Sequence, residues 1–203
     1  HFIRRFTSDP EFLRNNKDIE KIEQIPADER FPCQSPRDAL ALTSLFFPDE
    51  VALTYLPNGS ASDKPTRWSY LQYQQEVNRA ANLFYDLGLQ ADQSVIFLLP
   101  NVPQLLFGLW GTQIAGIAAP INPYLEVEHI ASIARSANAR ILVTLSPTEP
   151  GGEELWRKAM LAKEAVPSLN SIITVGASVA QDGLSWHQVT GQQPADRLIF
   201  DRK

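Results

Sequence analysis

The stretch SVIFLLPNVPQLLFGLWGTQIAGIAAPI, residues 94–121, decides the fold of this chain. Its first part, residues 94–99, is almost wholly apolar, which is typical of a strand covered on both faces in a parallel sheet. The apolar run that follows predicts a helix with Asn101 as its N-cap and Gly116 at its end. Residues 117–121 then predict a second strand. A strand, a helix and a strand in so short a stretch predict a βαβ unit.

Toward the N-terminus, the pattern predicts a helix and a hairpin. Apolar residues at helical spacing predict a helix at residues 39–46 that stops at Pro48. Two short β-like runs, 51–56 and 66–68, flank the turn sequence at 57–60. This arrangement predicts a small antiparallel hairpin.

Ser69 begins the most regular helical pattern in the sequence. Ser69 and Gln72 are spaced as in a capping box, in which each side chain satisfies a free backbone N–H of the other residue. Gly88 is expected to end the helix, because glycine readily adopts the left-handed backbone conformation. The apolar residues between them recur at intervals of three and four, as in an amphipathic helix that lies on a sheet. They are Tyr73, Val77, Ala80, Ala81, Phe84 and Leu87.

The alternation of strands and helices continues toward the C-terminus. The expected elements are a helix at 126–137, a strand at 140–145, a helix at 153–166 and a strand at 171–175. Glu126 and Glu128 suit the positive end of the first of these helices. The predicted fold class is therefore α/β, a doubly wound, mostly parallel sheet with flanking helices, plus the small antiparallel hairpin.

The chain divides into an arm and a domain. Residues 1–36 are charged, weakly periodic and interrupted by prolines, which predicts an N-terminal arm with one or two short helices. Residues 37–203 carry the packed pattern and are expected to form part of a single larger domain.

Composition excludes several classes of function. The net charge is -5 and the basic residues form no stripe, which argues against nucleic acid as a partner. Cys33 is the single cysteine, so no intrachain disulfide and no zinc cluster is expected, in keeping with a reducing, cytoplasmic setting. No transmembrane segment is expected, because the longest apolar run, residues 102–121, is interrupted by prolines and glutamines.

Ligands of open α/β sheets bind beyond the carboxyl ends of the strands, so phosphate-binding glycines are expected in the loops there. Gly151-Gly152 precedes a helix, but the acidic pair Glu153 and Glu154 follows at once, which favours a plain connection. Gly111 and Gly116 are spaced as in a Walker loop, but Ile117 stands where the lysine belongs, so this match is accidental.

The remaining candidate groups favour structural roles. Residues 58–64 combine Gly, Ser and Lys, but they lie between two hairpin strands and favour a solvated turn. The pairs Glu126/Glu128 and Glu153/Glu154 are interpreted as charges at helix N-termini rather than as an acid–base couple. Surface or packing roles are favoured for the histidines and packing for three tryptophans; these residues are His1, His129, His187, Trp68, Trp110 and Trp156.

Several short phrases occur in order across residues 45–175 and together carry a resemblance. They are Ser69-Tyr70, Val77-Asn78-Arg79-Ala80-Ala81-Asn82, Leu87-Gly88, Leu99-Pro100-Asn101 with Pro103, Ala115-Gly116, Pro120-Ile121-Asn122-Pro123 and residues 139–144. With these phrases the chain resembles the N-terminal domain of the adenylate-forming superfamily, which holds acyl-CoA synthetases, peptide-synthetase adenylation domains and firefly luciferase. Gln104 replaces the usual acidic residue, and Glu126 replaces the usual Thr or Ser cap.

The resemblance implies a two-step ligase that uses Mg-ATP and coenzyme A. A carboxylate attacks the α-phosphate, pyrophosphate leaves, and a thiol then takes the acyl group from the acyl-adenylate. In that family the phosphate is handled by a Ser/Thr/Gly-rich loop ending in lysine and by a lysine on a mobile C-terminal domain. Neither matches a position of this sequence, so no catalytic, cofactor-binding or metal residue is carried over, and the chain is expected to be truncated before that loop.

The leading interpretation is therefore the N-terminal portion of an AMP-forming acyl-CoA synthetase that is inactive by itself and binds no cofactor by itself. A fatty acid is the default substrate of the parent protein, and aryl or amino acids suit the same scaffold. The alternative is a free-standing α/β binding or interaction module without catalysis. The incomplete sheet is also expected to expose an apolar patch, which predicts self-association into a homo-oligomer.

Overall fold

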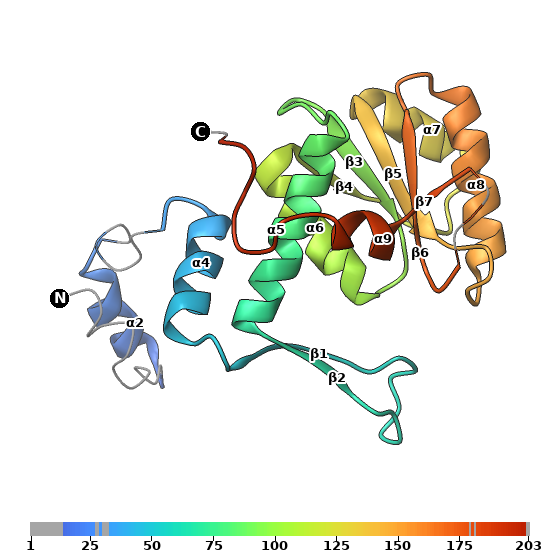
Figure 1. Cartoon of the computed structure of the whole chain (residues 1–203). Helices are drawn as coiled ribbons and strands as arrows, with labels where there is room; N and C mark the ends of the chain where they lie inside the picture. The colour runs from blue at the N-terminus through green and yellow to red at the C-terminus, as the bar shows by residue number, and fades with distance from the viewer. Residues whose placement is uncertain (1–13, 27–28, 30–32, 179, 181, 202–203) are drawn as a thin grey trace.

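The computed structural model describes residues 14–26, 29, 33–178, 180 and 182–201 (Figure 1). His1 and the parts of the predicted arm at 1–13, 27–28 and 30–32 lie outside the described residues. The helices are α2 (Asn16–Glu23), α4 (Pro36–Phe46), α5 (Tyr70–Asp86), α6 (Pro103–Ala115), α7 (Val127–Ser136), α8 (Gly152–Ala165) and α9 (Trp186–Gly191). The strands are β1 (Val51–Tyr55), β2 (Thr66–Ser69), β3 (Ser94–Leu98), β4 (Ile117–Pro120), β5 (Ala139–Leu145), β6 (Ser171–Val175) and β7 (Leu184–Ser185).

Five strands form one parallel sheet in the order β4-β3-β5-β6-β7. Every residue of β3 is buried, as its unbroken apolar sequence requires of a strand between two layers of helices. The predicted doubly wound α/β class is confirmed. β4 is an edge strand that ends at Pro120, a position where the missing N–H of proline costs no ladder bond.

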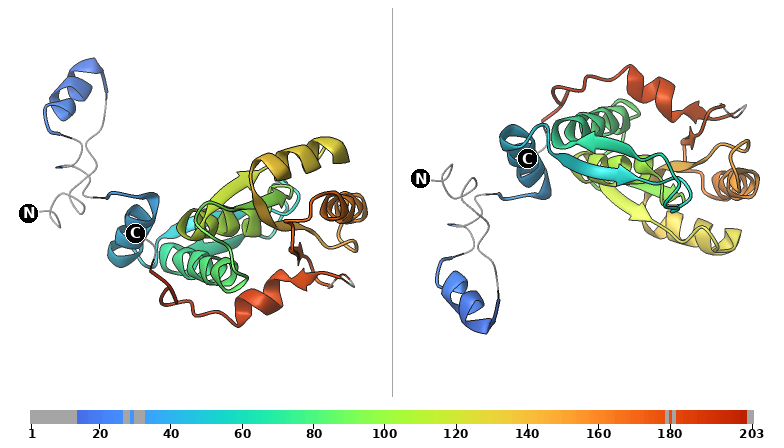
Figure 2. Two further views of the ribbon diagram at one scale, coloured as in Figure 1. Left: turned by 90° about the horizontal axis from the view of Figure 1, so that it is seen from above. Right: turned by 90° about the horizontal axis from the view of Figure 1, so that it is seen from below.

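The helices cover the two faces of the sheet. Side chains of α5, α6 and α9 pack with Val95, Phe97 and Val143 in one core. Side chains of α7 and α8 pack with Ile96, Leu98 and the opposite side of β5 in the other core. Figure 2 shows the two layers on either side of the strands. The alternation of side chains along each strand thus supplies both cores.

The start of α5 matches the sequence prediction in detail. The Oγ atom of Ser69 accepts the Gln72 N–H at 3.3 Å, and Gln72 Oε1 accepts the Ser69 N–H at 2.9 Å, so the capping box is present. The predicted inward residues of α5 from Tyr73 to Phe84 are buried, and Gly88 follows with φ 81°. The hairpin of β1 and β2 is antiparallel, also as predicted.

The predicted N-cap of α6 is wrong. The N-cap is Val102 rather than Asn101, and the helix begins at Pro103. Proline fixes a helical φ at the first position of a helix and keeps the preceding residue extended, and Val102 has φ −117° and ψ 155°. The ring of Pro103 therefore sets the boundary. Glu126 likewise lies just before α7 as an N-cap without a side-chain bond, although the predicted helix began with it.

The sequence also left two elements unpredicted. β7 and α9 follow β6, and β7 pairs parallel to β6 through Ile173 and Thr174. β7 has two residues and α9 has six, so neither is long enough to show a period of its own. In the described part of the chain, no helix combines the length and the apolar character needed to cross a membrane.

Candidate functional site

The carboxyl ends of β3 and β5 form the switch point of the sheet. β3 leads into α6, which lies on one face, whereas the neighbouring β5 leads into α8 on the other face. The two loops therefore diverge and leave a crevice between them, which is where open α/β sheets bind ligands.

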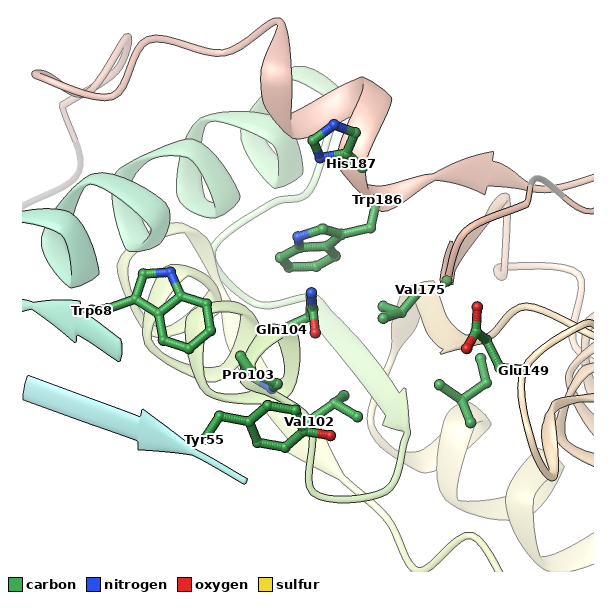
Figure 3. Close-up of a pocket in the computed structure, with 11 residues that line it drawn as sticks. Tyr55, Trp68, Val102, Pro103, Gln104, Glu149, Val175, Trp186 and His187 are labelled. Carbon is green, nitrogen blue, oxygen red and sulfur yellow. The ribbon is translucent and has the colours of Figure 1, made fainter. Parts of the chain in front are cut away.

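A cleft of about 420 Å³ lies there. Its lining comes from the hairpin, the start of α6, the loops after β5 and β6, and α9, and Figure 3 shows these side chains around it. The lining residues are Tyr55, Trp68, Val102, Pro103, Gln104, Leu145, Glu149, Val175, Gly176, Trp186 and His187. Three aromatic rings and several aliphatic groups make most of this wall.

The aromatic walls are held by packing. Trp68 meets Phe107 of α6 edge to face with ring centroids 5.5 Å apart, and Trp186 meets Phe84 of α5 at 6.2 Å. Trp186 is only 5% exposed, so its ring belongs to the core and presents one part to the cleft. The rings of Trp68 and Trp186 are therefore held in place by the protein itself.

Glu149 closes the cleft at the loop after β5. Its Oε1 accepts the Ala177 N–H at 2.8 Å, which ties this loop to the loop after β6. A Cβ atom on Gly176 would lie 2.6 Å from Glu149 Cγ, so only glycine lets this carboxylate approach the chain so closely. The hydroxyl of Ser146 lies 3.1 Å from that of Ser178 and adds a second link between the loops.

The charge of the cleft does not suit phosphate. Among the lining residues that the structure describes, Glu149 carries a negative charge and none is lysine or arginine. A phosphate group next to an uncompensated carboxylate is repelled, and phosphate sites normally supply cations or free N–H groups. The cleft therefore suits an apolar or uncharged group.

The glycines flagged in the sequence do not form a phosphate loop. The Gly152 N–H donates to the Glu149 carbonyl at 2.8 Å, so it is already used within the connection to α8. Gly111 lies inside α6, and Gly116 follows the end of that helix, so the Walker-like spacing is accidental, as predicted. In the hairpin loop, the Asp63 carboxylate accepts the N–H groups of Asn58 at 2.7 Å and Ser60 at 3.2 Å, which makes this loop a closed turn.

The other flagged residues lie apart from one another. His129 is exposed on α7, whereas His187 is exposed at the rim of the cleft. Glu154 pairs with Arg157 at 2.7 Å on the surface of α8. That pairing holds the pKa of Glu154 below its ordinary value, first through the hydrogen bond from Arg157. Trp110 and Trp156 pack against the two cores, as predicted.

Sequence reasoning missed the composition of the cleft. The sequence patterns single out neither Trp186 as a packing residue nor Glu149 within the loop after residue 145. One signal is present for both residues, which is their position at the carboxyl side of the sheet. Glu149 follows the end of β5, and Trp186 begins α9 directly after β7. Within the part of the chain that is described, no three His, Cys, Asp or Glu residues gather in a way that could hold a metal ion.

Comparison with known proteins agrees with this architecture. Residues 44–197 match the family model of the AMP-binding enzyme. The chain is 43% identical to marinolic acid–CoA ligase of a Pseudoalteromonas strain over 203 residues, which is 100% of this chain and 30% of that protein. It is 36% identical to crotonobetaine/carnitine–CoA ligase of Escherichia coli over 131 residues, which is 64% of this chain and 24% of that protein.

Solved structures show the same fold. The anthranilate CoA ligase AuaEII, in complex with anthranoyl-AMP, superposes with a TM-score of 0.69 at 19% identity, over 86% of this chain and 31% of that one. Acetoacetyl-CoA synthetase from Streptomyces lividans gives a TM-score of 0.66 at 20% identity, over 77% and 25%. The chain thus spans less than a third of the length of these relatives. With most of its length matched by the family model, the chain belongs to the family of AMP-binding enzymes.

Proposed function

We propose that this chain is the N-terminal portion of an AMP-forming acid–CoA ligase, which converts a carboxylic acid, ATP and CoA to acyl-CoA, AMP and pyrophosphate. The observation that carries the proposal is the family match over residues 44–197, together with curated relatives that are CoA ligases by name. Residues 37–203 are part of the catalytic domain in this proposal, and residues 1–36 are an arm. α2, which lies in this arm, has no buried residue and lies away from the sheet (Figure 2).

The adenylation step belongs, in this proposal, to parts of the protein outside these 203 residues. That step requires cations and backbone donors around the α-phosphate, where negative charge develops. The cleft offers Glu149 instead, and the sequence contains no Ser/Thr/Gly-rich loop ending in lysine. Mg-ATP and CoA are therefore cofactors of the whole ligase, and these residues by themselves supply scaffold.

The acid is proposed to be a fatty or other largely apolar acid, in a cytoplasmic enzyme. The aromatic and aliphatic lining of the cleft suits an apolar group, and the relatives named above act on acids of several kinds. Self-association is proposed to use the open edge of β4, where Ile117 is 48% exposed. Analytical ultracentrifugation that shows only monomer at high concentration would count against this last point.

ATP–pyrophosphate exchange tests the proposed function. A full-length protein that contains this chain is assayed with fatty, aryl and amino acids, beside the 203-residue chain at the same concentration. The full-length protein is expected to exchange label with at least one acid, and the 203-residue chain with none. Exchange by the shorter chain would contradict the assignment of the phosphate chemistry, and a silent full-length protein would contradict the ligase.

A further inference from the structure

The segment after α9, residues 192–200 and here called the strap, crosses one side of α5 (Figure 1). Two asparagines of α5 hold it. Asn82 Nδ2 donates to the Pro194 and Arg197 carbonyls, each at 2.9 Å, and Asn82 Oδ1 accepts the Ile199 N–H at 2.9 Å. Asn78 Nδ2 donates to the Ala195 carbonyl at 2.9 Å. Four hydrogen bonds thus tie two side chains to the main chain of the strap.

Burial of Asn82 costs free energy unless its carboxamide is hydrogen-bonded. Asn82 is 0% exposed and lies inside α5, although asparagine is a poor helix former. A buried carboxamide without partners would be strongly destabilising, but here both donors and the acceptor are satisfied by the strap. Because the partners are two carbonyls and one N–H, the orientation of the amide is fixed by its surroundings.

The contacts follow one stripe of the helix. Asn78, Asn82 and Tyr85 are spaced four and three residues apart, so they lie on one face of α5. The ring of Tyr85 stacks on Phe200 with centroids 4.3 Å apart and planes 10° apart. The strap is therefore fixed at both of its ends and in its middle.

The strap is continuous with α9, which carries two walls of the cleft. Trp186 and His187 begin this helix, and Trp186 packs on Phe84 of α5. α9 has only six residues, too few to hold its own position without tertiary contacts. Its place against the sheet consequently depends on the packing of Trp186 and Val189 in the core and on what anchors the chain on either side of it.

We infer that Asn78 and Asn82 are positioning residues, which fix the strap on α5 and thereby hold α9 and its tryptophan in place as a wall of the cleft. Since the bonds reach only main-chain atoms of the strap, the clamp sets the path of the backbone whatever the strap side chains are. The inference concerns the shape of the cleft and does not depend on the ligase reaction.

Hydrogen exchange and fluorine NMR of the 203-residue chain test this role. The variants are Asn82→Ala, Asn78→Ala and Asn82→Asp, which keeps an acceptor for Ile199 but loses both donors. Gln75→Ala is the matched control, because it removes a carboxamide from the same helix without a bond to the strap. Labelling with 5-fluorotryptophan gives separate signals for Trp186 and for Trp156, which packs in the opposite core.

In both Asn82 variants, amides of the strap are expected to exchange roughly tenfold faster or more, since two or three hydrogen bonds are lost. The Trp186 signal is expected to shift or broaden, while Trp156 and the amides of β3 and β5 stay unchanged. Asn78→Ala loses one hydrogen bond at a half-buried site and is expected to give a smaller change of the same kind. If the Asn82 variants do not fold, the Asn78→Ala result tests the inference instead. Unchanged strap exchange, or an unchanged Trp186 signal, in a folded variant would overturn the inference, as would an equal effect of Gln75→Ala.

Discussion

Replacing Gly111 by alanine is expected to destabilise the protein, although alanine is the better helix former. Gly111 lies in α6 where that helix meets α5. A Cβ atom there would lie 2.7 Å from Ala80 Cβ, 2.8 Å from the Ala81 nitrogen and 3.0 Å from the Val77 carbonyl oxygen. Ordinary contacts are 3.4–4 Å, so the two helices would have to separate by about 1 Å.

The size of the effect follows from two opposing terms. Two of the three atoms are backbone and cannot rotate away, so the cost lies near the upper end of overpacking penalties, about 3 kcal/mol. The gain in helix propensity from Gly to Ala is about 1 kcal/mol. We therefore expect a net loss of about 2 kcal/mol in the free energy of unfolding, or a fall of roughly 4 to 8 °C in melting temperature for a chain of this size.

Urea unfolding followed by circular dichroism measures this loss. Gly191→Ala is the matched control, because Gly191 ends α9 and a Cβ atom there meets nothing within 4 Å. The control is expected to be as stable as the wild type or slightly more stable. Equal stability of Gly111→Ala and Gly191→Ala would refute the close packing of α5 on α6.

Three further results are expected. Ser69→Ala breaks the capping box of α5 and should cost about 1 kcal/mol in thermal or urea unfolding, whereas an unchanged midpoint would speak against the cap. Burial raises the pKa of Tyr73 from 10.0 to about 12, so the stability that its neutral form supplies below pH 10 should fall as the pH rises toward 12. Tyr73→Phe should remove this part of the alkaline loss in unfolding curves recorded against pH. The hydrogen bond from the Asn58 side chain, above all, holds the pKa of Asp63 below its ordinary value of 3.8. The hairpin turn should therefore persist above that pH and loosen below it, which the amide shifts of Asn58 would report. Asp63→Asn should abolish this transition.

Local signals predicted the elements that are regular and long. The capping box at Ser69 and the apolar run of β3 each have one physical explanation, and both were located correctly. The N-cap of α6 was misplaced because Asn101 offered a side-chain cap, whereas Pro103 fixed the boundary through the backbone. Two competing local rules applied there, and the covalent constraint prevailed.

The cleft and the strap could not be predicted from local patterns. Glu149 and Trp186 are 37 positions apart in the sequence and line the same cleft only because parallel strands bring successive loops to one edge. Asn82 bonds residues more than a hundred positions away, so the sequence offers no more than a hint, a polar residue among the inward positions of α5. Such contacts follow from the order of the strands, which a single sequence does not state.

The central claim is that these residues form a parallel-sheet scaffold whose cleft does not hold phosphate. Isothermal titration of the 203-residue chain with Mg-ATP tests it most directly, with the Glu149→Gln variant beside it. No saturable binding of nucleotide is expected for the wild-type chain, because the cleft carries a carboxylate and no lysine or arginine among its described lining residues. Saturable binding of Mg-ATP by the wild-type chain, weakened by a substitution in the cleft such as Trp68→Leu, would contradict the account.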